Sequence, residues 1–204
     1  MDCMKLPSDS SLVRVFHASP EAPPVDIYVD GNLTFENLKF MDFTQYVPLK
    51  QGEYNIDVYA AGTKENPVIS QMLEIDDSDI YTVAATGNLD DLSLIVIEDS
   101  ISQQPFDMYS FFRVVHLSPD APAVDVLVND EVAFKDIEFR EGSMYQGVSP
   151  GQYRVKIALN SDGTVVLPLK VTLKPNRIYT LYAVGNASDL KVIQSVDGNT
   201  TVCR

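Results

Sequence analysis

The sequence contains no tryptophan and only two cysteines, and these absences limit the fold. Cys3 and Cys203 lie at opposite ends of the chain, outside both repeats, so neither repeat can contain an internal disulfide. Their spacing matches no zinc-binding pattern. They are either incidental thiols or a pair that links molecules head to tail, which requires an oxidising compartment.

Basic residues are scarce, because 15 Lys and Arg stand against 29 Asp and Glu and give a net charge of −14. Such a negative field repels phosphate backbones and anionic lipid surfaces, so we expect no nucleic-acid partner. No stretch approaches the ~20 apolar residues of a membrane-spanning helix. The first seven residues lack the basic start and apolar run of a secretory signal, which predicts an intracellular or spore-associated location.

The chain contains an internal repeat of about a hundred residues. A shift of 99 positions aligns residues 14–26, RVFHASPEAPPVD, with residues 113–125, RVVHLSPDAPAVD. The same shift pairs Tyr54 with Tyr153, and a shift of 98 pairs the segment Ile80-Tyr81-Thr82 with Ile178-Tyr179-Thr180. The duplication spans nearly the whole chain. It predicts an N-terminal extension (1–11), a first domain (12–98), a linker (99–110) and a second domain (111–204).

Apolar residues alternate with polar ones in both halves, which is typical of half-buried strands. Tyr54, Ile56 and Val58 alternate with polar neighbours, and their repeat partners alternate with Gln152, Arg154 and Lys156, so the outward face has changed charge. Pro168, within another alternating run, predicts an edge strand. Turn signals such as Asp30-Gly31 recur at short intervals.

These patterns predict an all-β protein with two tandem antiparallel β-sandwich domains of immunoglobulin-like topology, each with seven or eight strands. A true antibody-type domain is disfavoured, because the chain has neither a tryptophan nor paired core cysteines.

The repeated motif reads H-x-S-P-x-A-P-x-V-D, and each copy is followed later by a Y-T-x-x-A-x-G segment, at Tyr81–Gly87 and Tyr179–Gly185. Together these segments resemble the bacterial DUF4397 family, over nearly the entire chain and twice. The resemblance implies a domain of unknown function that is often exported or wall-associated, sometimes in tandem copies. It therefore implies a cell-envelope location.

We interpret the motif as a stiff corner between the first two strands of each domain. The serines are expected to bond nearby backbone amides and the prolines to fix φ, and each histidine is expected to bond a carboxylate or a turn carbonyl. These structural residues are His17, Ser19, Pro20, Pro23 and Asp26 in the first half, and His116, Ser118, Pro119, Pro122 and Asp125 in the second.

Two chemical alternatives exist for the same motif. A metal site is one, although a single His and a single Asp in each half supply too few ligands unless Glu21 or Asp120 also turns inward. A hydrolase that uses Ser19, His17 and Asp26 is the other, although no nucleophile elbow or oxyanion loop accompanies them. We therefore expect no catalytic residues, no cofactor and no resident metal at the motif.

Acidic clusters and outward tyrosines offer further candidates. Asp76-Asp77-Ser78-Asp79, Asp90-Asp91 and Glu98-Asp99 fall in predicted loops, where carboxylates can gather calcium, but solvated loop charge is the simpler interpretation. Tyr28 and Tyr59 are candidates for stacking on sugars, or are ordinary sheet residues.

The sequence thus favours a non-catalytic structural or interaction module of a bacterial cell envelope or spore surface, with a protein or a glycan as partner. One alternative is a hydrolytic or metal-dependent enzyme centred on His17 and His116. Another is a coat component that self-assembles through strand edges or terminal thiols. The sequence does not fix the oligomeric state.

Overall fold

The computed structural model describes residues 9–99 and 108–198, together with the backbone of residues 4–5 and 202–203. The chain divides into two compact units, residues 1–100 with 201–204, and residues 101–200. A short parallel pair, β1 (Met4–Lys5) with β18 (Val202–Cys203), belongs to the first unit. No helix in the described part of the chain is long and apolar enough to cross a membrane.

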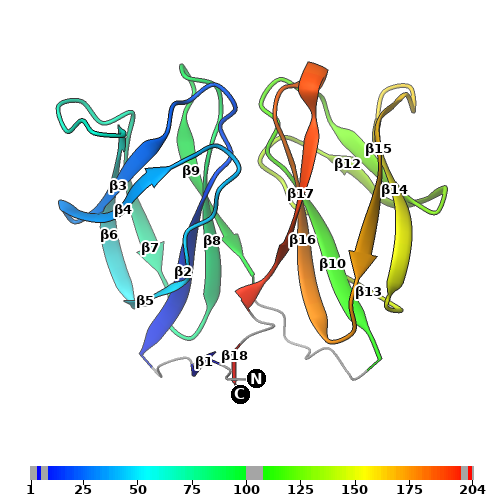
Figure 1. The fold of residues 1–204 in the computed structure, drawn as a ribbon, viewed down its shortest axis with the longest axis horizontal. Helices are drawn as coiled ribbons and strands as arrows, with labels where there is room; N and C mark the ends of the chain where they lie inside the picture. The colour runs from blue at the N-terminus through cyan, green and yellow to red at the C-terminus, as the bar shows by residue number, and fades with distance from the viewer. Residues whose placement is uncertain (1–3, 6–8, 100–107, 199–201, 204) are drawn as a thin grey trace. The chain divides into compact units, whose positions relative to one another are not determined.

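The first unit is a sandwich of two four-stranded sheets, β5-β2-β8-β9 and β4-β3-β6-β7 (Figure 1). Its strands are β2 (Ser10–His17), β3 (Val25–Val29), β4 (Asn32–Leu38), β5 (Val47–Lys50), β6 (Gly52–Ala60), β7 (Ile69–Ile75), β8 (Ile80–Thr86) and β9 (Ser93–Glu98).

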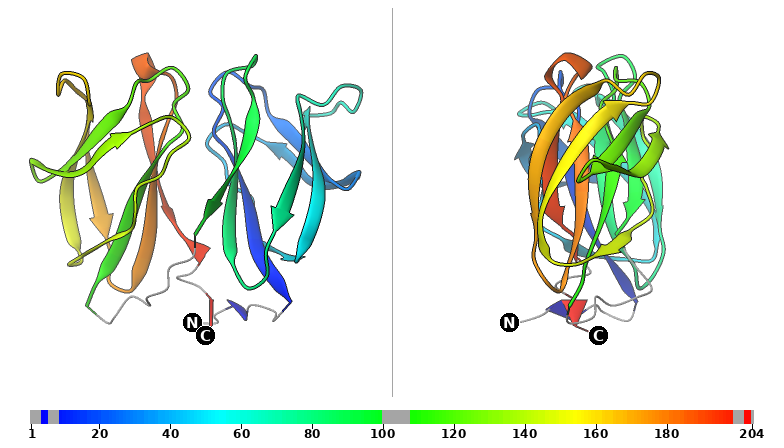
Figure 2. Two further views of the ribbon diagram at one scale, coloured as in Figure 1. Left: turned by 180° about the vertical axis from the view of Figure 1, so that it is seen from behind. Right: turned by 90° about the vertical axis from the view of Figure 1, so that its right-hand side faces the viewer.

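The second unit repeats this arrangement with the sheets β13-β10-β16-β17 and β12-β11-β14-β15 (Figure 2). Its elements are β10 (Ser110–His116), β11 (Val124–Val128), β12 (Glu131–Ile137), β13 (Gln146–Val148), β14 (Gly151–Leu159), β15 (Val165–Leu173), β16 (Arg177–Val184), the 3₁₀ turn η1 (Ala187–Asp189) and β17 (Lys191–Val196).

The prediction of two tandem immunoglobulin-like β-sandwiches is confirmed, with eight strands in each. One feature of the pairing was not predicted. The first strand of each sandwich runs parallel to the seventh, β2 beside β8 and β10 beside β16, whereas the other strand pairs described within the sandwiches are antiparallel.

The alternating residues form the core of each sandwich, as the period-two pattern requires. In the first unit Val13 and Val83 from one sheet face Ile27 and Val58 from the other, and all four are almost fully buried. Each such side chain contributes about 2 kcal/mol by leaving water. An equivalent cluster fills the second unit. β15, which contains Pro168, is the edge strand that the proline predicts.

Two-residue hairpins join the second and third strands of each sandwich. Asp30 and Gly31 both have positive φ, 49° and 76°, which is the type I′ geometry that matches the right-handed twist of paired strands. Asn129 and Asp130 take the same geometry in the second unit, with φ of 50° and 74°. Aspartate therefore occupies a position in the second unit where the first unit has glycine.

The two ends of the predicted linker 99–110 lie within the sandwiches. The backbone amide of Asp99 donates to the carbonyl of Ile80 in β8 at 2.7 Å, and Ser110 is the first residue of β10. The intervening residues 100–107 lie outside the described part of the chain.

Candidate functional site

The repeated motif connects the first two strands of each sandwich, crossing from one sheet to the other. His17 is the last residue of β2, and Asp26 is the second residue of β3. In the second unit His116 ends β10 and Asp125 follows the start of β11. The corner between them contains Ser19, Pro20 and Pro23, and correspondingly Ser118, Pro119 and Pro122.

Both histidines bond a carbonyl of their own corner. Nε2 of His17 lies 3.1 Å from the oxygen of Pro23, and Nε2 of His116 lies 3.2 Å from that of Pro122. Because a carbonyl oxygen only accepts, Nε2 must carry the hydrogen and donate it. This agrees with the predicted bond to a turn carbonyl. The two prolines therefore contribute a fixed acceptor as well as a fixed φ.

The second ring nitrogen differs between the two units. Nδ1 of His116 accepts a hydrogen bond from the backbone amide of Ser118 at 3.2 Å. Nδ1 of His17 is buried and has no hydrogen-bond partner among the described residues. Both rings are inaccessible to solvent and lie edge-on to a phenylalanine, Phe40 at 6.2 Å and Phe139 at 6.4 Å between ring centres. Burial lowers the pKa of both imidazoles below the usual value, because it penalises the charged ring.

The serines bond to a distant strand end, and the prediction that they bond nearby amides was wrong. The hydroxyl of Ser19 donates to the carbonyl of Gly87 at 2.7 Å, and that of Ser118 donates to the carbonyl of Gly185 at 2.5 Å. Both acceptors directly follow the strand that runs parallel to the histidine's strand. The observed hydrogen-bond partner differs from the predicted one because the parallel pairing of the first and seventh strands brings the end of the seventh strand next to the corner. A local sequence pattern cannot reveal this pairing.

The aspartates hold the backbone of two other loops. Asp26 is buried, and its two carboxylate oxygens accept from the amides of Asn37 and Gly62, both at 2.8 Å. In the second unit Oδ1 of Asp125 accepts from the side-chain amide of Asn160 at 3.0 Å and from the backbone amide of Asp136 at 2.9 Å.

The Asn160 bond, followed by the Asp136 bond, lowers the pKa of Asp125, because both stabilise the carboxylate. Among the described residues, no hydrogen bond joins a motif histidine to the aspartate of its own motif. His17, Ser19 and Asp26 are therefore directed to three different backbone partners and do not form a triad.

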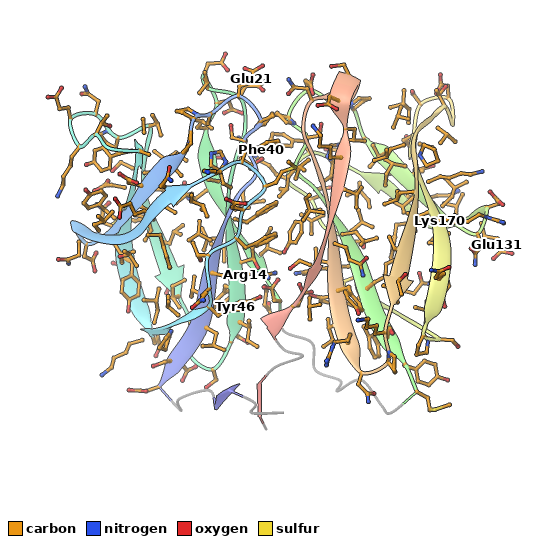
Figure 3. All side chains as sticks on the ribbon, viewed as in Figure 1. Arg14, Glu21, Phe40, Tyr46, Glu131 and Lys170 are labelled. Atoms are coloured by element: carbon orange, nitrogen blue, oxygen red, sulfur yellow. The ribbon has the colours of Figure 1, made fainter. Side chains whose placement is uncertain are left out.

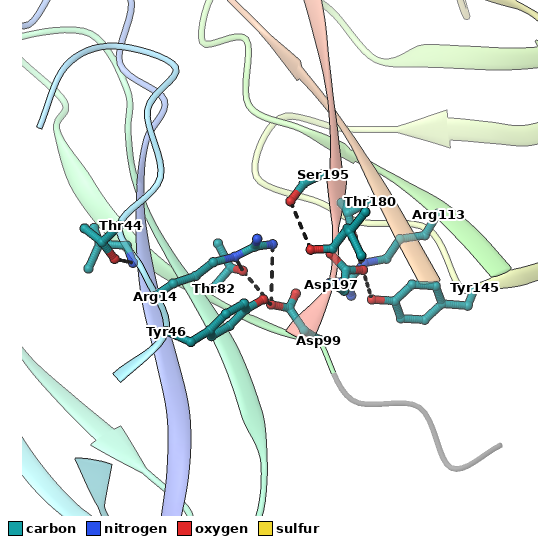
Figure 4. A network of polar contacts seen from close by, with 12 residues as sticks. Arg14, Thr44, Tyr46, Thr82, Asp99, Arg113, Tyr145, Thr180, Ser195 and Asp197 are labelled. Carbon is teal, nitrogen blue, oxygen red and sulfur yellow. Dashed lines mark hydrogen bonds and ion pairs between the residues drawn. The ribbon is translucent and has the colours of Figure 1, made fainter. Parts of the chain in front are cut away.

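Each unit also contains a buried polar network that sequence reasoning missed (Figure 4). Nε of Arg14 donates to the hydroxyl of Thr82 at 2.8 Å, and Thr82 in turn donates to Oδ2 of Asp99 at 2.5 Å. The phenol of Tyr46 donates to the same carboxylate oxygen at 2.9 Å, and an ion pair joins Nη2 of Arg14 to it at 3.8 Å.

The second unit repeats the network with Arg113, Thr180, Asp197 and Tyr145. In both units the guanidinium lies over the ring of the network's tyrosine, 4.7 Å from its centre for Arg14 and 4.4 Å for Arg113 (Figure 4). The preservation of all four residue types in both repeats is a sequence signal that would have identified this network.

The predicted acidic loops differ from one another. Asp99 is not a solvated loop residue, because its side chain is inaccessible and bonded within the first unit. In the described part of the chain, no group of three or more His, Cys, Asp or Glu residues is arranged to hold a metal ion. Calcium binding at Asp76–Asp79 or at Asp90-Asp91 stays a prediction.

The outward tyrosines are packed on each other. Tyr59 is only 8% exposed, and its ring meets that of Tyr28 edge-on at 5.2 Å. Nζ of Lys64 lies 4.4 Å from the centre of the Tyr28 ring. Tyr59 is therefore not an exposed surface on which a sugar could stack, which was one of the two roles the sequence suggested for it. Cys3 and the side chain of Cys203 lie outside the described part of the chain, so the pairing of these thiols stays a prediction.

Comparisons with known proteins identify a family for the chain. The family model described as a domain of unknown function (DUF4397) matches residues 11–111 and again residues 110–202. None of the curated proteins compared with the chain matches it.

Two solved structures align with most of this chain at low sequence identity. One is CBMbc (family CBM26) from Eubacterium rectale Amy13K in complex with maltoheptaose, with 10% identity, coverage of 93% of this chain and 99% of that chain, and a TM-score of 0.29. The other is the fimbrial anchor protein Mfa2 from Porphyromonas gingivalis, with 13% identity, coverage of 93% and 98%, and a TM-score of 0.26. At these TM-scores the similarity carries no information about function.

Proposed function

The chain belongs to the DUF4397 family, and from this premise we propose that it is a non-catalytic structural or interaction module, which binds a protein or a glycan at a bacterial cell envelope or spore surface. The family resemblance supports the proposed location. The way the motif side chains are used supports the proposed lack of catalysis.

One observation supports this proposal most strongly: each group of the motif that could perform chemistry is bonded to the backbone of the fold. A hydrolytic serine must donate its proton to a histidine nitrogen that is free to accept it. Ser19 instead donates to the Gly87 carbonyl, and Nε2 of His17 is itself a donor to Pro23. The second unit makes both of these contacts as well.

The same contacts count against a metal centre at the motif. A metal-bound imidazole needs a nitrogen with a free lone pair, and in the second unit neither is available, because Nε2 of His116 donates to Pro122 and Nδ1 accepts from Ser118. In the first unit the lone pair on Nδ1 of His17 has no partner among the described residues, but the ring is inaccessible to solvent. The oxygens of Asp26 are likewise occupied by two backbone amides. The surface of the sandwiches, where the two units differ in charge, then supplies the means to recognise a partner.

Co-sedimentation with isolated bacterial cell walls tests this proposal. We expect the purified protein to pellet with intact walls. Pretreatment of the walls with protease or with muramidase then shows whether the binding partner is a protein or a glycan. The double variant Ser19→Ala/Ser118→Ala is expected to pellet equally well at a temperature where it is folded. Hydrolysis of ester or glycoside substrates that Ser19→Ala abolishes in a folded protein would overturn the proposal, as would failure of the wild type to bind walls.

A further inference from the structure

The outer face of one sheet has opposite charge in the two units. In the first unit the exposed face of β6 and β7 carries Glu53, Asp57 and Glu74, which we call the acidic face. In the second unit the same face of the corresponding strands β14 and β15 carries Arg154, Lys156 and Lys170, which we call the basic face. The inward residues of these strands are apolar in both units.

Each face contains a like-charge pair on directly opposed residues. Glu53 pairs with Glu74 across β6 and β7, and Arg154 pairs with Lys170 across β14 and β15. Like charges in such positions destabilise a sheet. Neither glutamate has a hydrogen-bond or ion-pair partner among the described residues, and the same holds for Lys170. The fold therefore contains one pair of opposed negative charges and one pair of opposed positive charges. Contact between the two pairs would reduce the repulsion within each.

One carboxylate accompanies the basic face. Asp130, in the hairpin between β11 and β12, accepts from Nη2 of Arg154 at 3.1 Å and from Nζ of Lys156 at 2.6 Å. These side chains are 36–65% exposed, so the contacts are surface ion pairs that contribute little to stability. The face keeps an excess of positive charge, with Lys170 at its exposed edge strand (Figure 3).

The two units also differ strongly in net charge. Residues 9–99 carry 17 acidic and 4 basic side chains, a net charge of −13, whereas residues 108–198 carry 10 and 9, a net charge of −1. Nearly all the negative charge of the chain therefore lies in the first unit. When two copies meet, contact between unlike units is electrostatically less unfavourable than contact between two first units.

We propose that the acidic face of one molecule docks on the basic face of a second copy of the chain, in a head-to-tail contact. This proposal rests on the proposed function as an interaction module and names its partner. Because the two surfaces are different, the contact is heterologous, and each bound copy leaves one face free for a further molecule. Repetition of the contact builds an open chain of molecules.

Electrostatic complementarity of this kind sets orientation more than affinity. The faces are two strands wide, and the net charge of −14 opposes the approach of two molecules at long range. Salt screens that repulsion beyond a Debye length of about 8 Å at physiological ionic strength, while the facing charges remain in contact. The association is therefore expected to be weak, to increase with protein concentration and to be lost at high salt.

Two neutralising variants test the contact by analytical ultracentrifugation. Glu53→Gln/Glu74→Gln removes two of the three charges of the acidic face, and Arg154→Gln/Lys170→Gln removes two of the three charges of the basic face. The wild type should show a weight-average mass that rises with concentration. Each variant alone should stay monomeric, and an equimolar mixture of the two should form dimers and nothing larger, because each dimer has lost both of its outward faces.

A matched control carries the same charge change elsewhere. Glu65→Gln/Asp90→Asn removes two negative charges from exposed loops of the first unit and should associate as the wild type does. All four substituted face residues are exposed, so melting temperatures no lower than that of the wild type will show that the variants are folded.

Three results would overturn the inference: a wild type that is monomeric at every concentration at physiological salt, variants that associate normally, or a mixture that stays monomeric. If the monomeric wild type still pellets with cell walls, the proposed function stands and only the self-association is lost. If Arg154→Gln/Lys170→Gln then abolishes wall binding, the basic face serves an anionic wall partner instead.

Discussion

Ser19 and Gly87 are 68 positions apart, yet the serine hydroxyl donates a 2.7 Å hydrogen bond to the glycine carbonyl. The bond ties the corner after β2 to the end of β8, the strand that runs parallel to β2. Ser118 and Gly185 repeat it in the second unit. This contact explains physically why the H-x-S-P motif and the later glycine-ending segment occur together in both halves of the sequence.

Removal of the serine hydroxyl should destabilise its own unit. Ser19→Ala or Ser118→Ala leaves a buried glycine carbonyl without its donor, which costs about 1–3 kcal/mol. Chemical denaturation followed by circular dichroism measures the loss. An alanine variant with wild-type stability would show that water replaces the hydroxyl at no cost.

Gly185 should not tolerate a side chain. Its φ is +90°, and a Cβ at this residue would lie 2.6 Å from the carbonyl oxygen of Asp189. We expect Gly185→Ala to lower the free energy of unfolding by about 1–3 kcal/mol, because both the backbone conformation and the contact are unfavourable. Thermal unfolding measures the change, and Gly163→Ala is a useful comparison, since it shares a positive φ but has open space around it. Equal effects of the two substitutions would mean that backbone conformation alone is responsible.

The buried network should be far more sensitive to its aspartate than to its tyrosine. Asp99→Ala leaves the guanidinium of Arg14 buried without its carboxylate, which costs about 3–5 kcal/mol. Tyr46→Phe removes one hydrogen bond, worth roughly 1 kcal/mol, because Thr82 and Arg14 still contact the carboxylate. Urea unfolding of the two variants measures the difference. The account of the network fails if Asp99→Ala is no more destabilising than Tyr46→Phe.

The free energy of unfolding should fall as the pH drops below the ordinary pKa of histidine, about 6.5. The pKa of His17 and His116 is lowered in the folded state, so the unfolded chain binds protons more readily than the folded one. The stability from the neutral rings is complete above the unfolded pKa of about 6.5 and is lost as the pH falls from there towards the folded pKa.

Each histidine contributes up to about 1.4 kcal/mol per pH unit within that window. The melting temperature measured from about pH 8 to about pH 5 should therefore decrease. The double variant His17→Gln/His116→Gln should show a smaller decrease across the same window. An identical pH dependence in both proteins would exclude the histidines as its cause.

Local patterns in the sequence predicted the elements that depend on local spacing. The alternation of Tyr54, Ile56 and Val58 identified a half-buried strand, and Pro168 identified an edge. The partners of Ser19 and Asp99 could not be predicted in this way, because they depend on which strands become neighbours. Asp99 in particular follows a strand in an acidic run, and only the parallel pairing of β2 with β8 brings Arg14 and Thr82 together beside it.

The most direct test of the account is the nuclear magnetic resonance titration of the two imidazoles, which are the only histidines in the chain. A long-range ¹H–¹⁵N correlation spectrum distinguishes the two neutral tautomers and the charged ring. We predict that both rings are neutral with the hydrogen on Nε2, and that both stay so at pH values below the ordinary pKa of about 6.5 while the protein is folded. A ring that carries its hydrogen on Nδ1, or that titrates near its ordinary pKa in the folded protein, would contradict the structural role of the motif.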